Sequence, residues 1–397
     1  MTLIPIDEAQ RRLFALAKAL GTETVAITAA AGRYAAEPIV ARRTQPAADL
    51  SAMDGYAIRF DDLPGPWWQI GESAAGRPFA GEVGAGETVR IFTGAAMPAG
   101  ADTVMIQEEV AADGAAIALV GAGPATRGRN TRRKGLDFAT GVTLVEPGQR
   151  ITPARLAVAI TGGAIEAVVR RKVRVAIVST GDELVAPGMV TDGLSLPESN
   201  SPMLGAMLAD LPVEIVQLGI LPDDLATLTD AFRRVDADLL VTTGGASVGD
   251  HDLVRPALEA AGGSIDFWRI ALRPGKPMMA GRLGDAMMLG LPGNPVSAFV
   301  TALLFVRPLV AHLGGARDPF PTTTHAILGE DLPANNARTD YLRAELRPGP
   351  AGIRAYASTI QDSSMLRTLA RSNCLVIRPA NAPAARAGDA ADILVIA

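Results

Sequence analysis

The sequence predicts a multidomain α/β protein, and three observations carry this prediction. The chain has 397 residues, more than one ordinary hydrophobic core organises, so two to four domains are expected. Hydrophobic residues make up 48% and charged residues 20% of the chain, which is the balance of a globular rather than a disordered protein. In the second half, apolar strand-like runs alternate with helical segments, the pattern of a parallel sheet covered on both faces.

The first half of the chain changes character twice. We expect a helix over residues 6–20, where apolar residues recur at helical spacing and Gly21 follows. Short apolar runs separated by glycine and proline come next and indicate a small β-rich domain. Helical spacing returns over residues 151–169. The two helical pieces can therefore belong to one domain that the β-rich segment interrupts.

From Lys172 onward, strand and helix signals alternate. The expected strands are 172–180, 213–221 and 237–243, and the expected helices are 201–211 and 223–235. After Gly315 the signals are again those of strands and turns. We therefore expect a discontinuous N-terminal domain, a β-rich insert, an α/β parallel-sheet domain and a C-terminal β domain. Their expected bounds are 1–41 with 137–171, 42–136, 172–314 and 315–397.

Composition excludes several classes of protein. A single cysteine, Cys374, excludes a disulfide framework and a cysteine-built metal site, and three histidines make a poly-histidine zinc site a poor candidate. The net charge of −5 argues against general nucleic-acid binding. The apolar run 296–306 is shorter than the ~20 residues of a membrane span, and the first residues lack the order of a signal peptide. We expect a soluble, cytoplasmic protein that binds neither nucleic acid nor membrane.

Polar segments follow the expected strands, where parallel sheets bind their ligands. Ser179–Glu183 brings two carboxylates to a strand end, where they could hold Mg²⁺ or simply begin a helix. The segment 243–252 combines glycines, a hydroxyl and two aspartates, which suit a phosphate and a metal ion. Its GASVG stretch also matches a nucleophile elbow, which would make Ser247 a hydrolase serine. Gly249 and Pro256 disturb the helix that such an elbow needs, so the phosphate interpretation is favoured.

Cations gather on one stiff loop. Arg269, Arg273 and Lys276 lie on a segment with Pro274 and Pro277, and such a loop suits an oxyanion, with arginine as a planar fork and lysine as a point charge. A solvated surface loop is the alternative. The flanking prolines favour the functional interpretation, because they lower the entropy cost of holding the cations in place.

Three further segments are ambiguous by themselves. Residues 291–297 place two prolines and Gly-Asn before an apolar helix, which gives either an anion-binding helix start or a plain turn. Residues 51–57 and Thr93-Gly94 are turn signals. The basic loop 127–134 could guide an acidic ligand or could be a solvated face.

Taken together and in order, these segments resemble the molybdopterin molybdenumtransferase family, the MoeA and gephyrin E-domain group. The matching segments are SAMDGYA (51–57), RIFTGAAMP (90–98), RRKGLDF (132–138), STGDEL (179–184), GILPDD (219–224), GGASVGDHD (244–252), RPGKP (273–277) and LPGNPVS (291–297). They extend through nearly the whole chain.

The resemblance implies a fold and a reaction. It implies four domains, with an α/β domain of the molybdenum-cofactor-biosynthesis type. It also implies an elongated homodimer whose active cleft lies between the α/β domain of one subunit and the insert of the other. The implied reaction is the Mg²⁺-dependent insertion of molybdate into adenylated molybdopterin with release of AMP. An upstream molybdopterin adenylyltransferase is the implied partner.

The resemblance also implies roles for single residues. The functional acids are Asp54, Asp137, Glu183, Asp223 and Asp252, of which the last three are the expected Mg²⁺ ligands. The expected molybdate-binding residues are Arg269, Arg273, Lys276, Pro277 and Ser297, with Arg343 and Ser363 or Ser364 of the C-terminal domain closing the site. Thr93 is expected to position the nucleotide, and Gly244, Gly245 and Ser247 are expected to bind the pterin phosphate.

The chain departs from the family at three positions. Leu136 stands where a glutamate is usual, and Arg269 and Arg273 stand where lysines are common, so charge is kept but a planar fork replaces a point charge. Two other functions stay open. They are a gephyrin-like scaffold on the same fold and a serine hydrolase that uses Ser247.

Overall fold

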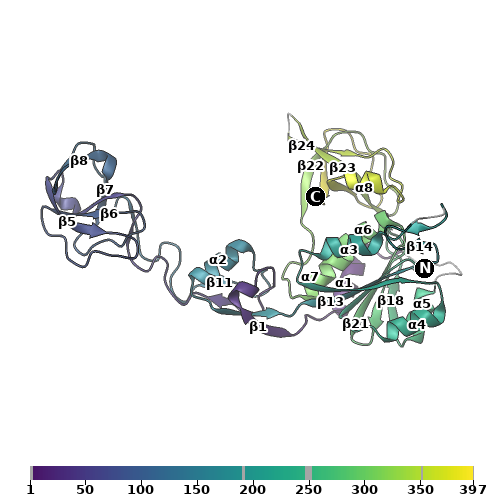
Figure 1. Cartoon of the computed structure of the whole chain (residues 1–397). Coiled ribbons are helices and arrows are strands. Elements are labelled where there is room, and N and C mark those ends of the chain that lie inside the picture. The colour runs from purple at the N-terminus through teal and green to yellow at the C-terminus, as the bar shows by residue number, and fades with distance from the viewer. Residues whose placement is uncertain (1–2, 190–192, 246–252, 350–351, 397) are drawn as a thin grey trace.

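The computed structural model describes residues 3–189, 193–245, 253–349 and 352–396. Figure 1 shows an elongated molecule, with the β-rich insert at one end and the α/β and C-terminal β domains together at the other. A small unit that contains helix α2 (Pro153–Thr161) lies between the two ends. This arrangement confirms the predicted multidomain α/β class.

Segments far apart in the sequence build the middle unit. Its antiparallel pairs are β1 (Thr22–Ala26) with β12 (Glu166–Arg170), and β2 (Ile39–Val40) with β11 (Thr143–Val145), and the 3₁₀ turn η1 (Ile27–Ala29) follows β1. The Thr152 side chain accepts a hydrogen bond from the Arg155 backbone N–H and so caps helix α2. Both flanks of the insert contribute side chains to one core, including Ile27, Ile39, Val145, Ile151 and Val169.

The insert is built around a sheet whose six described strands have the order β7-β4-β6-β5-β9-β8. Its strands are β4 (Gly55–Ile58), β5 (Trp67–Ser73), β6 (Glu87–Ile91), β7 (Thr103–Ile106), β8 (Val110–Asp113) and β9 (Ala116–Leu119), with 3₁₀ turns η2 (Phe60–Asp62) and η3 (Gln107–Glu109). A separate pair, β3 (Leu50–Ser51) with β10 (Thr131–Arg132), joins its first and last segments.

The α/β domain contains a mixed sheet of six described strands in the order β16-β13-β17-β21-β20-β18. The strands β16, β13, β17 and β21 are parallel, and β20 runs antiparallel to both of its neighbours. Their bounds are β13 (Val173–Thr180), β16 (Val213–Leu221), β17 (Leu239–Thr243), β18 (Ser264–Trp268), β20 (Met279–Leu283) and β21 (Ala286–Leu291), and a short parallel pair, β14 (Leu184–Val185) with β15 (Leu196–Pro197), follows β13.

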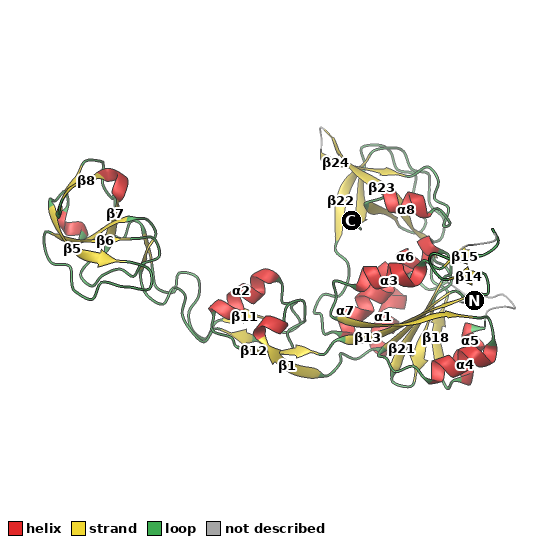
Figure 2. Cartoon of the chain, in the orientation of Figure 1, coloured by secondary structure: helices red, strands yellow, loops and turns green. Residues whose placement is uncertain are grey.

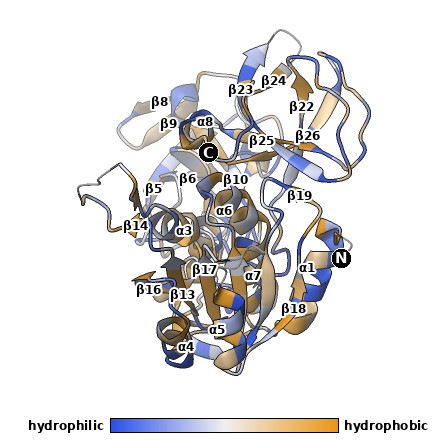
Figure 3. Cartoon of the chain, turned by 90° about the vertical axis from the view of Figure 1, so that its right-hand side faces the viewer, coloured by the Kyte–Doolittle hydropathy of each residue, from blue (hydrophilic) through white to orange (hydrophobic). Residues whose placement is uncertain are grey.

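Helices cover both faces of this sheet, as Figure 2 shows. The helices are α3 (Asn200–Leu208), α4 (Leu225–Arg233), α5 (Val254–Ala260), α6 (Pro295–Thr301) and α7 (Arg307–Leu313), with the π-helical turn η4 (Ala302–Val306) between the last two. Alternate residues of β13 face opposite cores, because side chains alternate along a strand. Val175 and Ile177 pack with Leu204 of α3, whereas Ala176 and Val178 pack with Phe232 of α4. Figure 3 shows the apolar character of β13 and β17.

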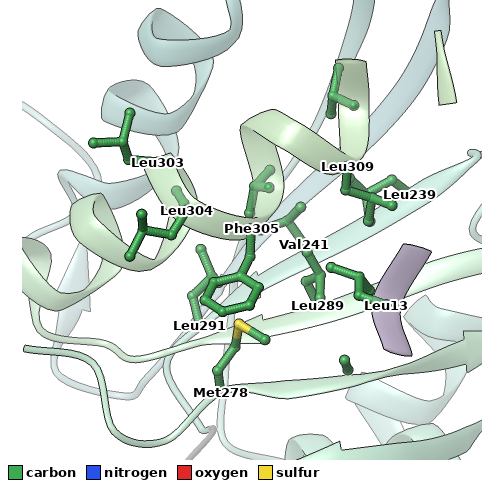
Figure 4. Packing of buried hydrophobic residues seen from close by; sticks show 14 of the residues in the cluster. Leu13, Leu239, Val241, Met278, Leu289, Leu291, Leu303, Leu304, Phe305 and Leu309 are labelled. Atoms are coloured by element: carbon green, nitrogen blue, oxygen red, sulfur yellow. The ribbon is translucent and has the colours of Figure 1, made fainter. Parts of the chain in front are cut away.

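The continuous helical segment Pro295–Leu313 is long and apolar enough to cross a membrane by length and composition, but 83% of it is buried inside the protein. Figure 4 shows Leu304, Phe305 and Leu309 of this segment packed over the sheet. Pro308 has no N–H for the Leu304 carbonyl four residues earlier. The Gln10 side chain donates a hydrogen bond to that carbonyl instead, at 2.9 Å.

The N-terminal helix α1 (Ile6–Leu16) belongs to the α/β core. Its buried residues Ala9 and Leu13 lie in the same cluster as Leu289 and Leu309, and Figure 4 shows Leu13 beside Leu289. This differs from the expected grouping of residues 1–41 with 137–171, because α1 buries its apolar face against α7 rather than in the middle unit. The helix is also shorter than the expected 6–20. The other expected domain bounds stay predictions.

The C-terminal domain is a small closed barrel. Its strands are β22 (Thr323–Leu328), β23 (Thr339–Gly349), β24 (Gly352–Ala357), β25 (Cys374–Arg378) and β26 (Ala390–Val395), and helix α8 (Leu366–Arg371) precedes β25. The barrel closes because β23 pairs with both β24 and β25. The short strand β19 (Leu272–Arg273) of the α/β domain pairs in parallel with β23, so the barrel is docked directly on the predicted cation loop.

Candidate active site

Three predicted loops meet beyond the carboxyl ends of β13, β17 and β21. Gly244 has φ +92°, and a Cβ there would lie 2.3 Å from the Thr180 carbonyl oxygen. A Cβ on Gly293 would lie 3.4 Å from the Gly244 Cα. The Gly244 N–H donates to the Leu291 carbonyl at 3.3 Å. Glycine is required at position 244 on both grounds, since its φ is positive and its neighbour is backbone.

A buried polar network lies beneath these loops. The Ser179 hydroxyl lies 2.8 Å from Glu198 Oε1, 2.8 Å from the Ser201 hydroxyl and 3.1 Å from the Thr243 hydroxyl. Glu198 also accepts the Ser201 backbone N–H at 2.9 Å, and Asn200 donates to the Gly293 carbonyl at 2.8 Å. The network ties the start of α3 to the ends of β13 and β17.

Our sequence reasoning missed Glu198, Asn200 and Ser201. A detectable signal was present, because the run Glu198-Ser199-Asn200-Ser201 precedes an apolar helix and combines the residue types that hydrogen-bond at helix starts. Only the last residue of this run, Ser201, belongs to the expected helix over 201–211. These residues support the loops that carry the candidate site.

The candidate acids follow neighbouring strands. Thr180 of β13 is the register partner of Leu221 of β16, so Glu183 and Asp223 both lie just beyond this edge of the sheet. The Asp223 backbone N–H donates to Asp182 Oδ1 at 3.0 Å, which joins the two loops.

The acid set is only partly described. Carboxylate oxygens are the ligands that Mg²⁺ prefers, and Glu183 and Asp223 supply this donor type. Among the described residues, no group of three or more histidine, cysteine or acidic side chains is arranged to hold a metal ion. Two predicted residues, Asp252 and Ser247, lie outside the described residues.

The cation loop lies against helix α6. Gly275 has φ +111°, and a Cβ there would lie 2.4 Å from the Thr301 hydroxyl and 3.5 Å from the Ser297 carbonyl oxygen. The Lys276 carbonyl accepts the Ile270 N–H at 3.1 Å, which closes the loop. Lys276 is exposed and Ser297 is buried. The structure therefore brings Lys276 and Ser297 into one neighbourhood.

The other two predicted members of this loop are Arg269 and Pro277, and the backbone of Arg269 helps to hold the loop in place. Arg269 has φ +86°, its N–H donates to the Met278 carbonyl at 3.4 Å, and its carbonyl accepts the Ile4 N–H at 3.3 Å. Pro277 is half-buried. Both residues lie where the loop joins the N-terminal segment and strand β20.

Arg273 is already paired with a carboxylate of the C-terminal barrel. Its Nη2 donates to Asp340 Oδ2 of the barrel. The Asp340 side chain is 3% exposed and that of Arg273 is 46% exposed. Burial raises the pKa of the Asp340 carboxyl, while the Arg273 hydrogen bond acts in the opposite direction. Sequence reasoning missed Asp340, because no local pattern connects two residues 67 positions apart.

Arg343 lies inside the barrel wall. It is 1% exposed, its Nη2 donates to the Asp362 carbonyl at 2.9 Å, and burial lowers the pKa of its guanidinium. Ser363 is half-buried, and the Ser364 hydroxyl donates to Asp362 Oδ1 at 2.6 Å. This loop precedes α8, which contacts α6, so these residues border the α/β domain but are engaged with one another.

The insert carries a second cluster. Asp54 Oδ1 accepts the Thr93 backbone N–H at 2.7 Å and its hydroxyl at 2.8 Å, and these two hydrogen bonds lower the pKa of Asp54. The Arg90 guanidinium lies 5.0 Å from the Tyr56 ring centre and 5.1 Å from that of Phe92. Asp54 is thus a half-buried carboxylate that two hydrogen bonds from the exposed Thr93 hold in place.

The predicted residues do not all meet within one chain. Asp54 and Thr93 lie in the insert, at the opposite end of the molecule from the cation loop, as Figure 1 shows. Asp137 is exposed where the insert returns to the middle unit, and its N–H donates to the Gln45 carbonyl at 3.1 Å. Leu136 beside it is exposed.

Comparisons with known proteins agree with this architecture. Three family models match in order, described as MoeA N-terminal region (domain I and II) over residues 4–163, probable molybdopterin binding domain over 176–312 and MoeA C-terminal region (domain IV) over 325–396. A molybdopterin molybdenumtransferase of Haemophilus influenzae is 35% identical over 94% of each chain, and molybdopterin molybdenumtransferase 2 of Mycobacterium tuberculosis is 34% identical over 96% of this chain and 97% of its own.

The solved structures agree too. A molybdopterin biosynthesis MoeA protein of Pyrococcus horikoshii OT3 matches with a TM-score of 0.84 and 27% identity over 100% of both chains. The chain is therefore an enzyme of molybdenum cofactor biosynthesis. It belongs to the molybdopterin molybdenumtransferase family, as the eight sequence segments predicted.

Proposed function

We propose that this enzyme inserts molybdate into adenylated molybdopterin and releases AMP in a Mg²⁺-dependent reaction. The main supporting observation is that three kinds of binding group lie at one edge of the α/β sheet. Glycine loops suit phosphate, Glu183 and Asp223 suit a divalent cation, and the loop with Arg273 and Lys276 suits an oxyanion.

In this proposal each loop has one task. Backbone N–H groups near Gly244 and Gly245, with Ser247, bind the pterin phosphate. Arg273, Lys276 and Ser297 hold the molybdate dianion, and Arg269, Pro277, Arg343, Ser363 and Ser364 shape or border that site. Glu183, Asp223 and Asp252 hold Mg²⁺. The ion, when bound, neutralises pyrophosphate charge and so favours departure of AMP.

The insert acts in the partner subunit's site. We propose a homodimer, because Asp54, Asp137 and Thr93 have their family counterparts in the functional set yet lie away from the cation loop of their own chain. An isologous pair would bring two such sites together by symmetry. The adenylated substrate comes from a molybdopterin adenylyltransferase, and the reaction takes place in the cytoplasm.

One assay tests this proposal. The purified protein is incubated with adenylated molybdopterin, molybdate and Mg²⁺, and AMP release is followed. We expect AMP only when all three are present, and a large loss in Glu183→Gln with the fold and the dimer intact. AMP release that ignores molybdate, or wild-type release by Glu183→Gln, would contradict the proposal. Labelling by a fluorophosphonate probe, in turn, would favour the serine-hydrolase alternative.

A further inference from the structure

The ion pair between Arg273 and Asp340 joins two domains at the proposed oxyanion site. Asp340 lies on β23, where it is the register partner of Arg273 on β19. Its side chain is 3% exposed, whereas that of Arg273 is 46% exposed. The guanidinium therefore contacts a buried carboxylate on one side and faces the solvent on the other.

The Asp340 carboxylate is only half satisfied. Its Oδ2 accepts from Arg273 Nη2, and its Oδ1 is buried without a hydrogen-bond partner among the described residues. Burial raises the pKa of this carboxyl, and the hydrogen bond from Arg273 and the nearby cations Arg338 and Arg378 act in the opposite direction. The ion pair with Arg273 therefore places the anionic partner of this guanidinium inside the fold rather than on a mobile surface side chain.

We propose that Asp340 is an internal anion that competes with the bound oxyanion for the charge of Arg273, and that it thereby sets the affinity and the charge selectivity of this site. The inference rests on the proposed function, in which Arg273 helps to hold molybdate. Asp340 is a positioning residue, since it acts through Arg273 and does not touch the substrate.

The arginine at position 273 makes this role possible. A guanidinium presents five N–H donors in a planar fork, so it can hold Asp340 with one edge and offer another to a ligand. A lysine ammonium carries its three donors on one compact atom and has no second planar edge to offer. In this chain, the arginine that stands in place of the common family lysine is the residue that pairs with Asp340.

Charge selectivity follows from Coulomb's law. The repulsion between Asp340 and a bound anion is proportional to the charge of that anion, so the penalty in free energy is twice as large for a dianion as for a monoanion. Molybdate is a tetrahedral dianion, and perrhenate is a tetrahedral monoanion of similar shape. A role in packing alone would weaken or strengthen the two anions equally.

The test compares these two anions in Asp340→Asn. The asparagine keeps an oxygen that accepts from Arg273, so mainly the charge is removed. Binding of molybdate and of perrhenate to the purified full-length protein is measured by calorimetry. We expect perrhenate to bind roughly tenfold more tightly than in the parent and molybdate roughly a hundredfold more tightly, since a doubled free energy squares the ratio.

The matched control is Asp238→Asn. Asp238 is also a carboxylate bound to an arginine, with Oδ1 2.5 Å and Oδ2 2.8 Å from Arg171, but it precedes β17 at the other end of the sheet. Its removal should leave both anion affinities unchanged. Asp340→Ser removes the same charge with a smaller side chain and replaces the asparagine variant if that variant does not fold.

Each outcome has a distinct meaning. If the parent protein binds no molybdate and molybdate does not stimulate AMP release, the proposed function is wrong. If the parent binds molybdate, three results for Asp340→Asn would contradict the proposed role of Asp340. These are unchanged affinity for both anions, lower affinity for both anions, and an affinity that rises by the same factor for molybdate and for perrhenate. Failure of both Asp340 variants to fold would also overturn it, because Asp340 would then be a structural anchor.

Discussion

Among single residues, Lys276 and Arg273 hold different positions on the same loop. Lys276 is exposed, whereas Arg273 already pairs with Asp340. Burying an unpaired dianion would be costly. Because Asp340 partly neutralises Arg273, the exposed Lys276 ammonium supplies the positive charge that the dianion needs. We infer from this comparison that Lys276 is the main cation of the proposed site.

We therefore expect Lys276→Ala to raise the molybdate concentration for half-maximal insertion roughly ten- to hundredfold, since a charge-assisted hydrogen bond contributes about 1.5–3 kcal/mol. Lys276→Arg should restore only part of the affinity, because a planar fork does not reproduce a compact ammonium. The measurement is AMP release at saturating adenylated pterin, with the exposed Lys18→Ala as control. An unchanged molybdate requirement together with weaker pterin binding would instead assign the loop to the pterin phosphate.

At the scale of elements, the strand ends depend on the buried network around Glu198. Glu198→Ala would remove the carboxylate that accepts hydrogen bonds from the Ser179 hydroxyl and the Ser201 N–H. We expect a loss of about 1–3 kcal/mol in the free energy of unfolding, and a smaller loss in Glu198→Gln, which keeps an oxygen. Urea midpoints and hydrogen exchange of β13 and β17 measure this loss of stability.

The control is Glu214→Ala on the exposed side of β16, whose free energy of unfolding should stay within about 0.5 kcal/mol of the parent value. Equal effects of both alanine variants would mean that the network does not stabilise the site.

The elements also show what a sequence can predict. Strands β13, β16 and β17 lie where the apolar runs predicted them, because a buried parallel strand is a local pattern. The helix expected over 296–306 continues to Leu313. A charged residue at position 307 suggests the end of an apolar helix. In the structure the Arg307 guanidinium donates two hydrogen bonds to the Asp210 carboxylate, at 2.6 and 2.7 Å, and these residues are 97 positions apart in the sequence. The Arg273–Asp340 pair escaped prediction for the same reason. Motif loops were visible in the sequence, whereas partners supplied by another domain were not.

At the scale of the whole molecule, the two clusters of predicted residues are separated by the middle unit. The Asp54–Thr93 pair belongs to the insert, and Glu183 follows β13 of the α/β domain at the far end (Figure 1). Among the described residues, the contacts that join the middle unit to the segments at the α/β end of the molecule include three polar ones: Arg170 donates to the Leu20 carbonyl, the Arg317 N–H donates to the Gly148 carbonyl, and Arg150 contacts Asp210. These contacts involve the middle unit alone, and Figure 1 shows the insert extending away from its own α/β domain.

A shared site makes a quantitative prediction about mixed dimers. Asp54→Ala and Glu183→Ala should each be inactive, because every site of either homodimer lacks one acid. In a mixed dimer one site carries both substitutions and the other carries none. After complete subunit exchange of equal amounts, half of the dimers are mixed and each has one intact site, so about a quarter of the wild-type AMP release should return.

The matched control mixes Asp54→Ala with Thr93→Ala. Both changes lie in the same cluster, so this mixture should restore no AMP release. Exchange is verified with differently tagged subunits. Activity that stays at background despite exchange, or equal recovery in the control mixture, would show that each chain works with its own insert.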